Sequence, residues 1–380
     1  MQSVLHAEAL IIGAGPAGAS LATWLAQQGW DCILVDRSRF PRTKPCAGCL
    51  SPRCRPFVKR LGLEEVVGSG QRIRFIDVQG PNLSVRFDAA KNPLGADFTV
   101  VSREKLDLLL VERARSHSVR FLEGFPVEAL KRDGNRVVGA AARDREIRAK
   151  VTVVATGANS RFLPPDRRPK MRSYQALIGW FEGLADLDPS VTDLFTAPWL
   201  MGSGWIYPES SRRVNVGVMV HADLLKGSGK SLRELFERYC STHFARRRLR
   251  GATRVGRLAG SPIRYALKPE GICGDGFLMI GEASLLTHPL TGEGISQALR
   301  SAEIAARTLQ GARDAGVFTG EALMPYAQGI REMFRRNFWK ARFLRKWIDR
   351  PLRLSASMLL TRHCPGLKPW IEGRLNRFVL

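Results

Sequence analysis

The sequence predicts an α/β fold built on a nucleotide-binding βαβ unit, and three observations near the N-terminus carry this prediction. Residues 9–12 are an apolar run that leads directly into a G-x-G-x-x-G pattern over 13–18. Residues 19–28 favour a helix, and a second apolar run over 32–35 ends at Asp36. The order strand, glycine turn, helix, strand and acid is typical of a Rossmann-like dinucleotide-binding domain.

Each member of this unit has a physical task. Gly13 makes the tight turn, Gly15 lets the backbone approach a diphosphate, and Gly18 lets the helix pack closely on the strand. The helix N-terminus then offers backbone N–H groups to the phosphate charge. Asp36 ends the second strand, where its carboxylate can accept hydrogen bonds from ribose hydroxyls.

The later elements are predicted from apolar spacing and capping residues. In chain order we expect a helix over 52–61 capped by Ser51, strands within 72–101, a helix over 103–116 capped by Ser102, short strands up to 156, strands of a second sheet over 173–220, helices within 231–250, a buried strand over 276–281, and helices over 293–312 and 321–348.

This order predicts a nucleotide-binding domain that is interrupted by a β-rich lobe, and such an insertion places a second substrate over the cofactor. The predicted domains are a discontinuous nucleotide-binding domain over 1–71, 97–172 and 272–320, a β-rich substrate domain over 173–271 with 72–96 nearby, and a basic helical C-terminal region over 321–380.

Composition narrows the class of protein. The 380 residues suffice for two or more lobes, and no apolar run has the length of a membrane span. The N-terminus lacks the basic segment of a signal peptide. Seven scattered cysteines argue against a disulfide framework, so we expect a cytoplasmic protein.

The net charge is the unusual feature of the composition. There are 59 Lys and Arg residues against 35 Asp and Glu residues, which gives a net charge of +24 and favours an anionic partner. No nucleic-acid-binding motif is apparent, so we expect no nucleic acid among the partners. An anionic membrane surface and an acidic protein stay open as partners.

The C-terminal region carries much of this charge. Nine basic residues lie between 331 and 353, and aromatic residues recur among them at helical spacing: Phe334, Phe338, Trp339, Phe343 and Trp347. A basic amphipathic helix of this kind fits docking on anionic lipid at the inner face of a membrane. The alternative is a helix that packs its aromatic side chains on the body of the protein.

A second glycine-rich segment completes the predicted cofactor site. The apolar run 276–281 leads to Glu282, and a loop over 288–294 opens the helix that follows. Backbone N–H groups at that helix N-terminus, near Gly292, Gly294 and Ile295, can stabilise the negative charge that a flavin ring gains on reduction.

Five separated motifs together make the chain similar to the geranylgeranyl reductase family of FAD-dependent oxidoreductases, within the p-hydroxybenzoate-hydroxylase-like flavoproteins. They are the opening glycine motif, K-P-C-A-G-C-L-S-P-R at 44–53, S-R-E-K-L-D at 102–107, G-W-I-Y-P at 204–208, and the segment 281–295. The resemblance implies a Rossmann-like FAD-binding domain, an inserted β-rich substrate domain and a helical C-terminal region.

The resemblance also implies roles for individual residues. Gly13, Gly15, Gly18 and Asp36 would hold the ADP half of FAD, and Arg103 would contact the phosphate or ribityl region. Glu282 stands where the family has a ribityl-binding Asp, one methylene shorter.

Cys46 would lie in the loop that faces the flavin ring and would donate a proton while flavin N5 delivers hydride to an alkene. Three alternatives stay open: a small buried side chain that fills space, a metal site with Cys49 and Cys54, and a redox disulfide with Cys49. The C-x-x-C spacing lacks a fourth metal ligand, so we expect no metal. His288 is a second proton-transfer candidate, and its alternative is a surface loop histidine.

Trp205, Tyr207 and Pro208 resemble the family's substrate-pocket motif Y-x-W-x-F-P, with Ser203 in place of its Tyr. They are predicted to wall an apolar cavity, and the alternative is ordinary sheet core. Thr156 replaces the Asp of a second family signature, A-D-G-A-N-S. The electron donor therefore stays open among NAD(P)H, ferredoxin and flavodoxin.

Three functions are compatible with these residues. The first is reduction of C=C bonds in an isoprenoid or other lipophilic substrate by hydride transfer from flavin N5. The second is a flavin monooxygenase that hydroxylates an aromatic group, free or peptide-bound, with a halogenase as a variant. The third is a flavin-bound binding factor without enzymatic activity.

Overall fold

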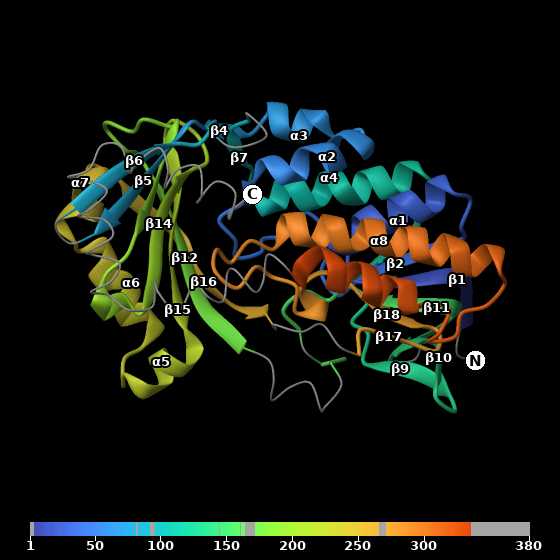
Figure 1. Cartoon of the computed structure of the whole chain (residues 1–380). Coiled ribbons are helices and arrows are strands. Elements are labelled where there is room, and N and C mark those ends of the chain that lie inside the picture. The colour runs from blue at the N-terminus through green and yellow to red at the C-terminus, as the bar shows by residue number, and fades with distance from the viewer. Residues whose placement is uncertain are drawn as a thin grey trace.

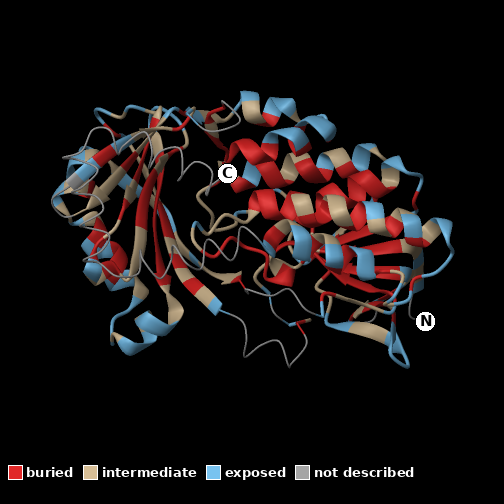
Figure 2. Ribbon diagram, viewed as in Figure 1, coloured by how far each residue is buried: buried red, intermediate tan, exposed pale blue. Residues whose placement is uncertain are grey.

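The computed structural model describes residues 4–80, 83–91, 96–143, 145–159, 161–163, 172–265 and 271–335, and places them in two lobes that lie side by side (Figure 1). One lobe contains an eight-stranded sheet covered by long helices. The other contains a seven-stranded sheet with short helices on its outer face. Buried residues concentrate in the sheets and in the helix faces that pack on them (Figure 2).

The first lobe is built on a parallel sheet. Its strand order is β17-β18-β11-β1-β2-β8, with β10 paired to β11 and β9 paired to β10. β1 (Val4–Ile12) pairs in parallel with β2 and with β11, so the carboxyl ends of these strands share one edge. The other strands are β2 (Cys32–Asp36), β8 (Arg120–Glu123), β9 (Ala129–Asp133), β10 (Arg136–Ala142), β11 (Arg145–Val154), β17 (Cys273–Gly274) and β18 (Phe277–Met279).

Three helices cover one face of this sheet. α1 (Pro16–Gln27) lies between α4 (Arg103–Ser116) and α8 (Ile295–Asp314) and contacts both (Figure 1). Ten residues of α1 are buried, mostly small or apolar, which allows the helix to sit close to the strands. The short elements are η1 (Pro52–Cys54), α2 (Arg55–Arg60), α3 (Glu64–Gly68) and η4 (Gly281–Ser284), with a small sheet of β3 (Cys49–Leu50), β4 (Gln71–Ile73) and β7 (Phe98–Val100).

The second lobe is a mainly antiparallel sheet with the order β16-β12-β15-β14-β13-β5-β6. Its strands are β5 (Phe75–Gly80), β6 (Leu83–Asp88), β12 (Arg172–Glu182), β13 (Val191–Phe195), β14 (Gly202–Pro208), β15 (Arg213–His221) and β16 (Thr253–Tyr265). Its helices are α5 (Ala222–Gly227), α6 (Leu232–Cys240), α7 (His243–Arg248) and η3 (Pro198–Leu200). α6 packs on β12 and β15, which leaves the opposite face of the sheet toward the first lobe.

The predicted mixed α/β fold is confirmed, and so is the helix 103–116, in which the Ser102 hydroxyl accepts the Lys105 N–H as a cap. Ser51 does occupy the N-cap position with Pro52 after it, and the chain is helical from Pro52 to Arg60, first as the 3₁₀ turn η1 and then as α2. The prediction is wrong for the cap bond alone, because the Ser51 hydroxyl donates instead to the Glu293 carboxylate. The Ser51 hydroxyl therefore bonds to a residue of a distant loop and not to the backbone of the helix that follows it.

The predicted C-terminal helix is described only in part. Residues 324–335 are helical, and the Phe334 side chain is buried in the core of the first lobe. Phe338, Trp339, Phe343 and Trp347, with most of the basic segment, lie outside the described residues. In the part of the chain that the structure describes, no helix is long and apolar enough to cross a membrane.

Candidate active site

A cavity of about 1420 Å³ lies between the two lobes. The first lobe contributes the glycine turn, the loop over 42–47, η4 and the start of α8, and the second lobe contributes the inner faces of β5, β12, β13, β14 and β16. A pocket for one small molecule has roughly 300–1,000 Å³. This cavity therefore has room for a large cofactor and a second molecule beside it.

The three glycines of the first turn have distinct geometry. Gly13 has φ +109°, and a Cβ there would lie 2.4 Å from the Ala155 carbonyl oxygen. A Cβ at Gly18 would lie 1.9 Å from the Gly13 carbonyl oxygen, so helix and turn touch through their backbones. Gly15 differs, because its Cβ position faces open space in the cavity. The nearest atoms there are guanidinium nitrogens of Arg42, at 3.7 Å, and Arg103, at 4.0 Å.

These two arginines form a cationic clamp around a buried carboxylate. Arg103 donates from Nε and Nη2 to Asp107, each at 2.8 Å, and Arg42 reaches the same carboxylate at 2.9 Å. Burial alone would lower the pKa of Arg103, but Asp107 and the Cys46 thiol outweigh it and raise that pKa. The clamp therefore holds two cations and one anion beside Gly15, with net charge left for a phosphate ligand.

Asp36 lies at the end of β2, as predicted, and its carboxylate is oriented by the backbone. Oδ2 accepts the Ala14 N–H at 2.8 Å and Oδ1 accepts the Ser38 N–H at 2.9 Å. A carboxylate has about four acceptor positions, so others stay available on the cavity side for ribose hydroxyls. Together with the clamp and the open Gly15, this geometry fits the ADP half of FAD.

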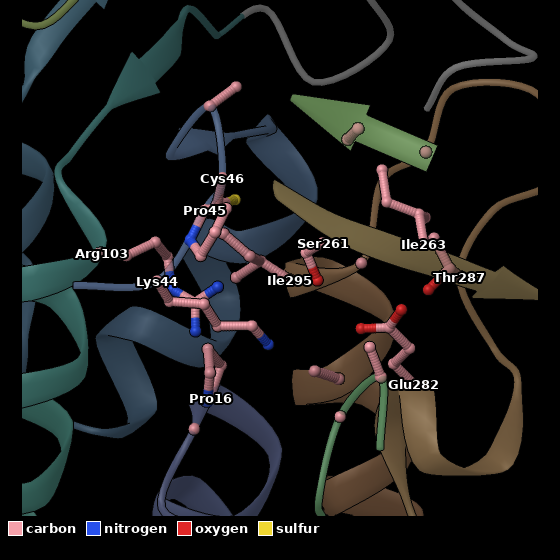
Figure 3. Close-up of a pocket in the computed structure, with 18 of the residues that line it drawn as sticks. Pro16, Lys44, Pro45, Cys46, Arg103, Ser261, Ile263, Glu282, Thr287 and Ile295 are labelled. Atoms are coloured by element: carbon pink, nitrogen blue, oxygen red, sulfur yellow. The ribbon is translucent and has the colours of Figure 1, made fainter. Parts of the chain in front are cut away.

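Glu282 and Lys44 face each other across the cavity (Figure 3). Glu282 follows β18, and its Oε1 accepts the backbone N–H of Arg264 at 2.9 Å. Burial raises the pKa of Glu282, with Lys44 opposing this shift. Burial also lowers the pKa of Lys44, and the nearby Arg103 lowers it further. An acceptor and a donor on opposite walls suit the polyol chain between diphosphate and ring.

The Glu282→Asp variant should keep or improve FAD retention. Its shorter side chain restores the residue type of the related reductases and withdraws the carboxyl from Arg264 toward its own strand. FAD occupancy after dialysis, measured by absorbance, checks this. A clear fall in occupancy would show that the longer side chain of Glu282 is needed at this position.

The start of α8 lies at the cavity. Gly294 is its N-cap without a side-chain cap bond, and the first turn contains no acidic residue. Gly292, with φ +69°, is held against Met219 of β15, since a Cβ there would lie 2.9 Å from its sulfur. Gly292, Gly294 and Ile295 all line the cavity. The positive end of a 20-residue helix therefore faces any anionic ring that binds there.

Cys46 lines the cavity in the same loop as Lys44, close to Arg103 (Figure 3). Its sulfur accepts the Gly48 N–H at 3.4 Å and hydrogen-bonds to Arg103. Cys49 bonds to Tyr207, and burial raises the pKa of both groups. Cys46, Cys49 and Cys54 are free thiols. Within the described ranges no group of His, Cys, Asp and Glu side chains is placed to hold a metal ion.

His288 lies neither in the cavity, where a proton-transfer group would be, nor at the surface, as the alternative expected. Only 2% of its surface is exposed, and it is absent from the cavity lining. Its Nδ1 accepts the Thr291 N–H at 3.3 Å. Burial, with the nearby Arg53, lowers the pKa of His288 to about 4. The ring is therefore neutral near pH 7 and stabilises the 288–294 loop, and we propose no catalytic role for it.

The substrate-pocket motif is divided by strand alternation. Ser203, Trp205 and Tyr207 of β14 line the cavity, while Pro208 does not. The remaining wall of this lobe is mostly apolar. Segments that the sequence predicted only as strands contribute Ile76, Val78, Val85, Phe87, Ala176, Ile178, Leu194 and Phe195. Ile263 comes from β16, a strand that the sequence did not predict.

Several residues that shape the site have no sequence signal. Arg42 lines the cavity and Asn215 accepts a hydrogen bond from Trp205 of its wall, but neither belongs to a motif. Lys44 is one letter of the motif at 44–53. A visible signal did exist for the clamp, because Arg103 and Asp107 are four residues apart on one helix and therefore share a face. Arg42 and Asn215 reach the site through tertiary contacts that have no local pattern.

Comparison with known proteins assigns the family. The model of the FAD binding domain family matches residues 6–210, more than half of the chain. Menaquinone reductase of Mycobacterium tuberculosis is 29% identical over 316 residues, which cover 80% of this chain and 76% of the relative. Digeranylgeranylglycerophospholipid reductase of Methanoculleus marisnigri is 26% identical over 328 residues, 83% of this chain and 80% of the relative.

Solved structures share the fold. A geranylgeranyl bacteriochlorophyll reductase-like protein of Thermoplasma acidophilum has a TM-score of 0.79 at 18% identity, covering 91% of this chain and 88% of the other. A flavin-dependent brominase has a TM-score of 0.73 at 23% identity, with 94% of each chain covered. The chain belongs to the FAD binding domain family, and it is an FAD-dependent oxidoreductase with the fold of the geranylgeranyl reductase-like flavoproteins.

Proposed function

We propose that this protein reduces carbon–carbon double bonds of an isoprenoid or other lipophilic substrate. The observation that supports the proposal best is the apolar wall that continues from the cofactor-binding residues along β5, β6 and β13. Burying an aliphatic chain there contributes about 0.8 kcal/mol for each CH₂ group. The relatives' names, which refer to a menaquinone and to a digeranylgeranyl phospholipid, favour the same substrate class.

Bound FAD, reduced by an external donor of the NAD(P)H, ferredoxin or flavodoxin class, supplies the hydride for this reaction. The chain itself supplies the rest. The N-terminus of α8 directs its positive end to the cavity, where it would stabilise a bound anion. The apolar wall excludes water from the reacting alkene. The Cys46 thiol donates the second hydrogen as a proton and recovers it from solvent.

The runner-up is a flavin monooxygenase that hydroxylates an aromatic substrate. The specific observation in its favour is the aromatic wall of Trp205 and Tyr207, against which an aromatic ring can pack. A probable FAD-dependent monooxygenase of Pseudomonas aeruginosa also shares the fold, with a TM-score of 0.71 at 23% identity. The two reactions differ in their need for oxygen.

An anaerobic turnover experiment separates them. FAD-loaded protein is reduced without oxygen and mixed with a polyprenyl quinone, and the masses of the products are measured by mass spectrometry. The proposal predicts that the quinone, reoxidised in air so that any quinol returns to quinone, is two hydrogen atoms heavier for each side-chain double bond reduced. A product that appears only with oxygen and carries one added oxygen atom would replace reduction by hydroxylation.

The Cys46→Ser variant should bind FAD normally and turn over about 100-fold more slowly, because a serine hydroxyl is a much weaker acid than a thiol. Cys273→Ser is the matched control, since that thiol does not line the cavity. Steady-state rates and flavin absorbance are the measurements. Unchanged turnover of Cys46→Ser would reduce Cys46 to a packing residue.

We also propose that the basic segment 331–353 docks the protein on anionic lipid, where a lipophilic substrate resides. Charge and aromatic spacing support this. The full chain should sediment with anionic liposomes, and a variant with Arg342, Arg345 and Lys346 changed to glutamine should sediment less. If neither protein sediments, the segment has another partner.

A further inference from the structure

Trp205 is held rigidly in the cavity wall. Its ring lies over Gly217 of the neighbouring strand β15, where a Cβ would come within 2.1 Å of the ring. Its Nε1 donates to Oδ1 of Asn215 at 2.9 Å, and this bond is buried. The position of the Trp205 ring is therefore set by its contact with Gly217 and by its hydrogen bond to Asn215.

The Asn215 amide has a second partner in the other lobe. Its Nδ2 donates to the Cys46 carbonyl oxygen at 3.3 Å, across 169 residues of sequence. The side chain is fully buried and does not line the cavity. An indole N–H only donates and a carbonyl only accepts, so these two partners fix which end of the amide faces each of them.

The cysteine loop is thus fixed from two sides. On the side of the small sheet, Gly48 has φ +68°, its Cβ position is 2.1 Å from the Val101 carbonyl oxygen, and the Val101 N–H bonds to the Gly48 carbonyl. On the side of the second lobe, Asn215 holds the Cys46 carbonyl. The Cys46 thiol belongs to this anchored segment, because the Cys46 carbonyl is one of the two groups held.

We propose that Asn215 is a positioning residue that links the Cys46 loop to Trp205 in the cavity wall. The position of the Cys46 thiol then depends on the position of the Trp205 ring. The proposal rests on the proposed function for the role of the thiol, but the link itself is independent of turnover. A shift of about 1 Å at a reacting group can cost about 100-fold in rate. Because Asn215 lies behind the wall, it contributes through Trp205 and Cys46 and not through contact with substrate.

The test measures the rate at which iodoacetamide alkylates Cys46 in the full-length, FAD-loaded protein, with the Cys46 peptide quantified by mass spectrometry. Asn215→Leu removes both bonds, and we expect alkylation at least threefold faster than in the unmodified protein. FAD content and melting temperature are recorded in parallel, so that a loosened loop is distinguished from a misfolded chain.

Asn215→Asp gives a sharper result because its effect depends on pH. A protonated carboxyl can accept from Trp205 and donate to the Cys46 carbonyl, whereas the ionised form has no donor and repels that oxygen. The ratio of alkylation rates, variant to unmodified protein at the same pH, should approach one as pH falls and increase as pH rises. Taking this ratio cancels the intrinsic pH dependence of thiol alkylation.

Two tryptophan variants complete the test, one as a second probe of the link and the other as its matched control. Trp205→Phe keeps an aromatic ring but removes the donor to Asn215, and it should also accelerate alkylation. Trp180→Phe removes an indole bond of similar length, 3.0 Å to Glu209, on the same sheet but outside the cavity, and it should change nothing.

A folded, FAD-loaded Asn215→Asp protein with unmodified alkylation rates at every pH would overturn the link, even if Asn215→Leu does not fold. If the proposed function is wrong, the result is different. No alkene reduction is then observed, and all of these alkylation rates are still as predicted.

Discussion

The Gly15→Val variant should lose FAD affinity by at least about 100-fold while the apoprotein stays as stable as before. Gly15 has φ −78° and ψ −173°, which valine adopts without strain, and the space at its Cβ is open. The isopropyl group would instead fill the gap beside Arg42 and Arg103, where the diphosphate must lie. FAD titration followed by fluorescence and thermal melting of the apoprotein measure the two effects.

Gly13→Ala is the comparison for this experiment. Its positive φ and the 2.4 Å approach of a Cβ to the Ala155 carbonyl predict that this variant loses both stability and FAD binding. A Gly15→Val protein that still binds FAD with full affinity would mean that the diphosphate does not pass over Gly15.

The Arg103→Leu variant should lower the free energy of unfolding by about 3 kcal/mol and weaken FAD binding at least tenfold. Asp107 is fully buried and would keep only Arg42 as a cationic partner. The loss of one cation from the phosphate site weakens binding separately from this effect on the fold. Chemical denaturation and FAD titration measure the two quantities.

The double variant Arg103→Leu with Asp107→Leu separates the two roles. Removing the carboxylate as well eliminates the underpaired buried anion, and Arg42 keeps Asp36 at 4.0 Å, so stability should return toward that of the unmodified protein. FAD affinity should not return, because the cation is still missing. If affinity returns together with stability, Arg103 acts on FAD only through the fold.

The features that could be predicted from the sequence are those that local stereochemistry dictates. A tight turn against Ala155, close packing of α1 on that turn and an acid at the end of β2 all require particular residue types within one short segment. For this reason the positions predicted for Gly13, Gly18 and Asp36 agree with the structure. The cap at Ser102 is local in the same sense.

Features that depend on distant partners could not be predicted in this way. The Ser51 hydroxyl bonds to Glu293, 242 residues away, and Asn215 bonds to Cys46 across 169 residues. No periodicity marks either contact. His288 lies in the expected motif, but its burial depends on how the loop folds back against its own backbone.

One error was avoidable from strand geometry alone. Successive side chains of a strand point to opposite faces, so Trp205 and Tyr207 share a face and Pro208 cannot join them. The family motif predicts all three residues in the pocket, but alternation assigns Pro208 to the other side of β14. The same rule places Ser203 in the cavity, as the structure does.

The central claim is that one cavity holds FAD and an apolar second molecule side by side, with Cys46 between them. A crystal structure of the FAD-loaded protein with a polyprenyl quinone tests it most directly. We expect the diphosphate over Gly15, the flavin ring beside the start of α8, and the prenyl chain along the wall that contains Trp205. A flavin ring far from Cys46, or a prenyl chain bound outside this cavity, would contradict the account.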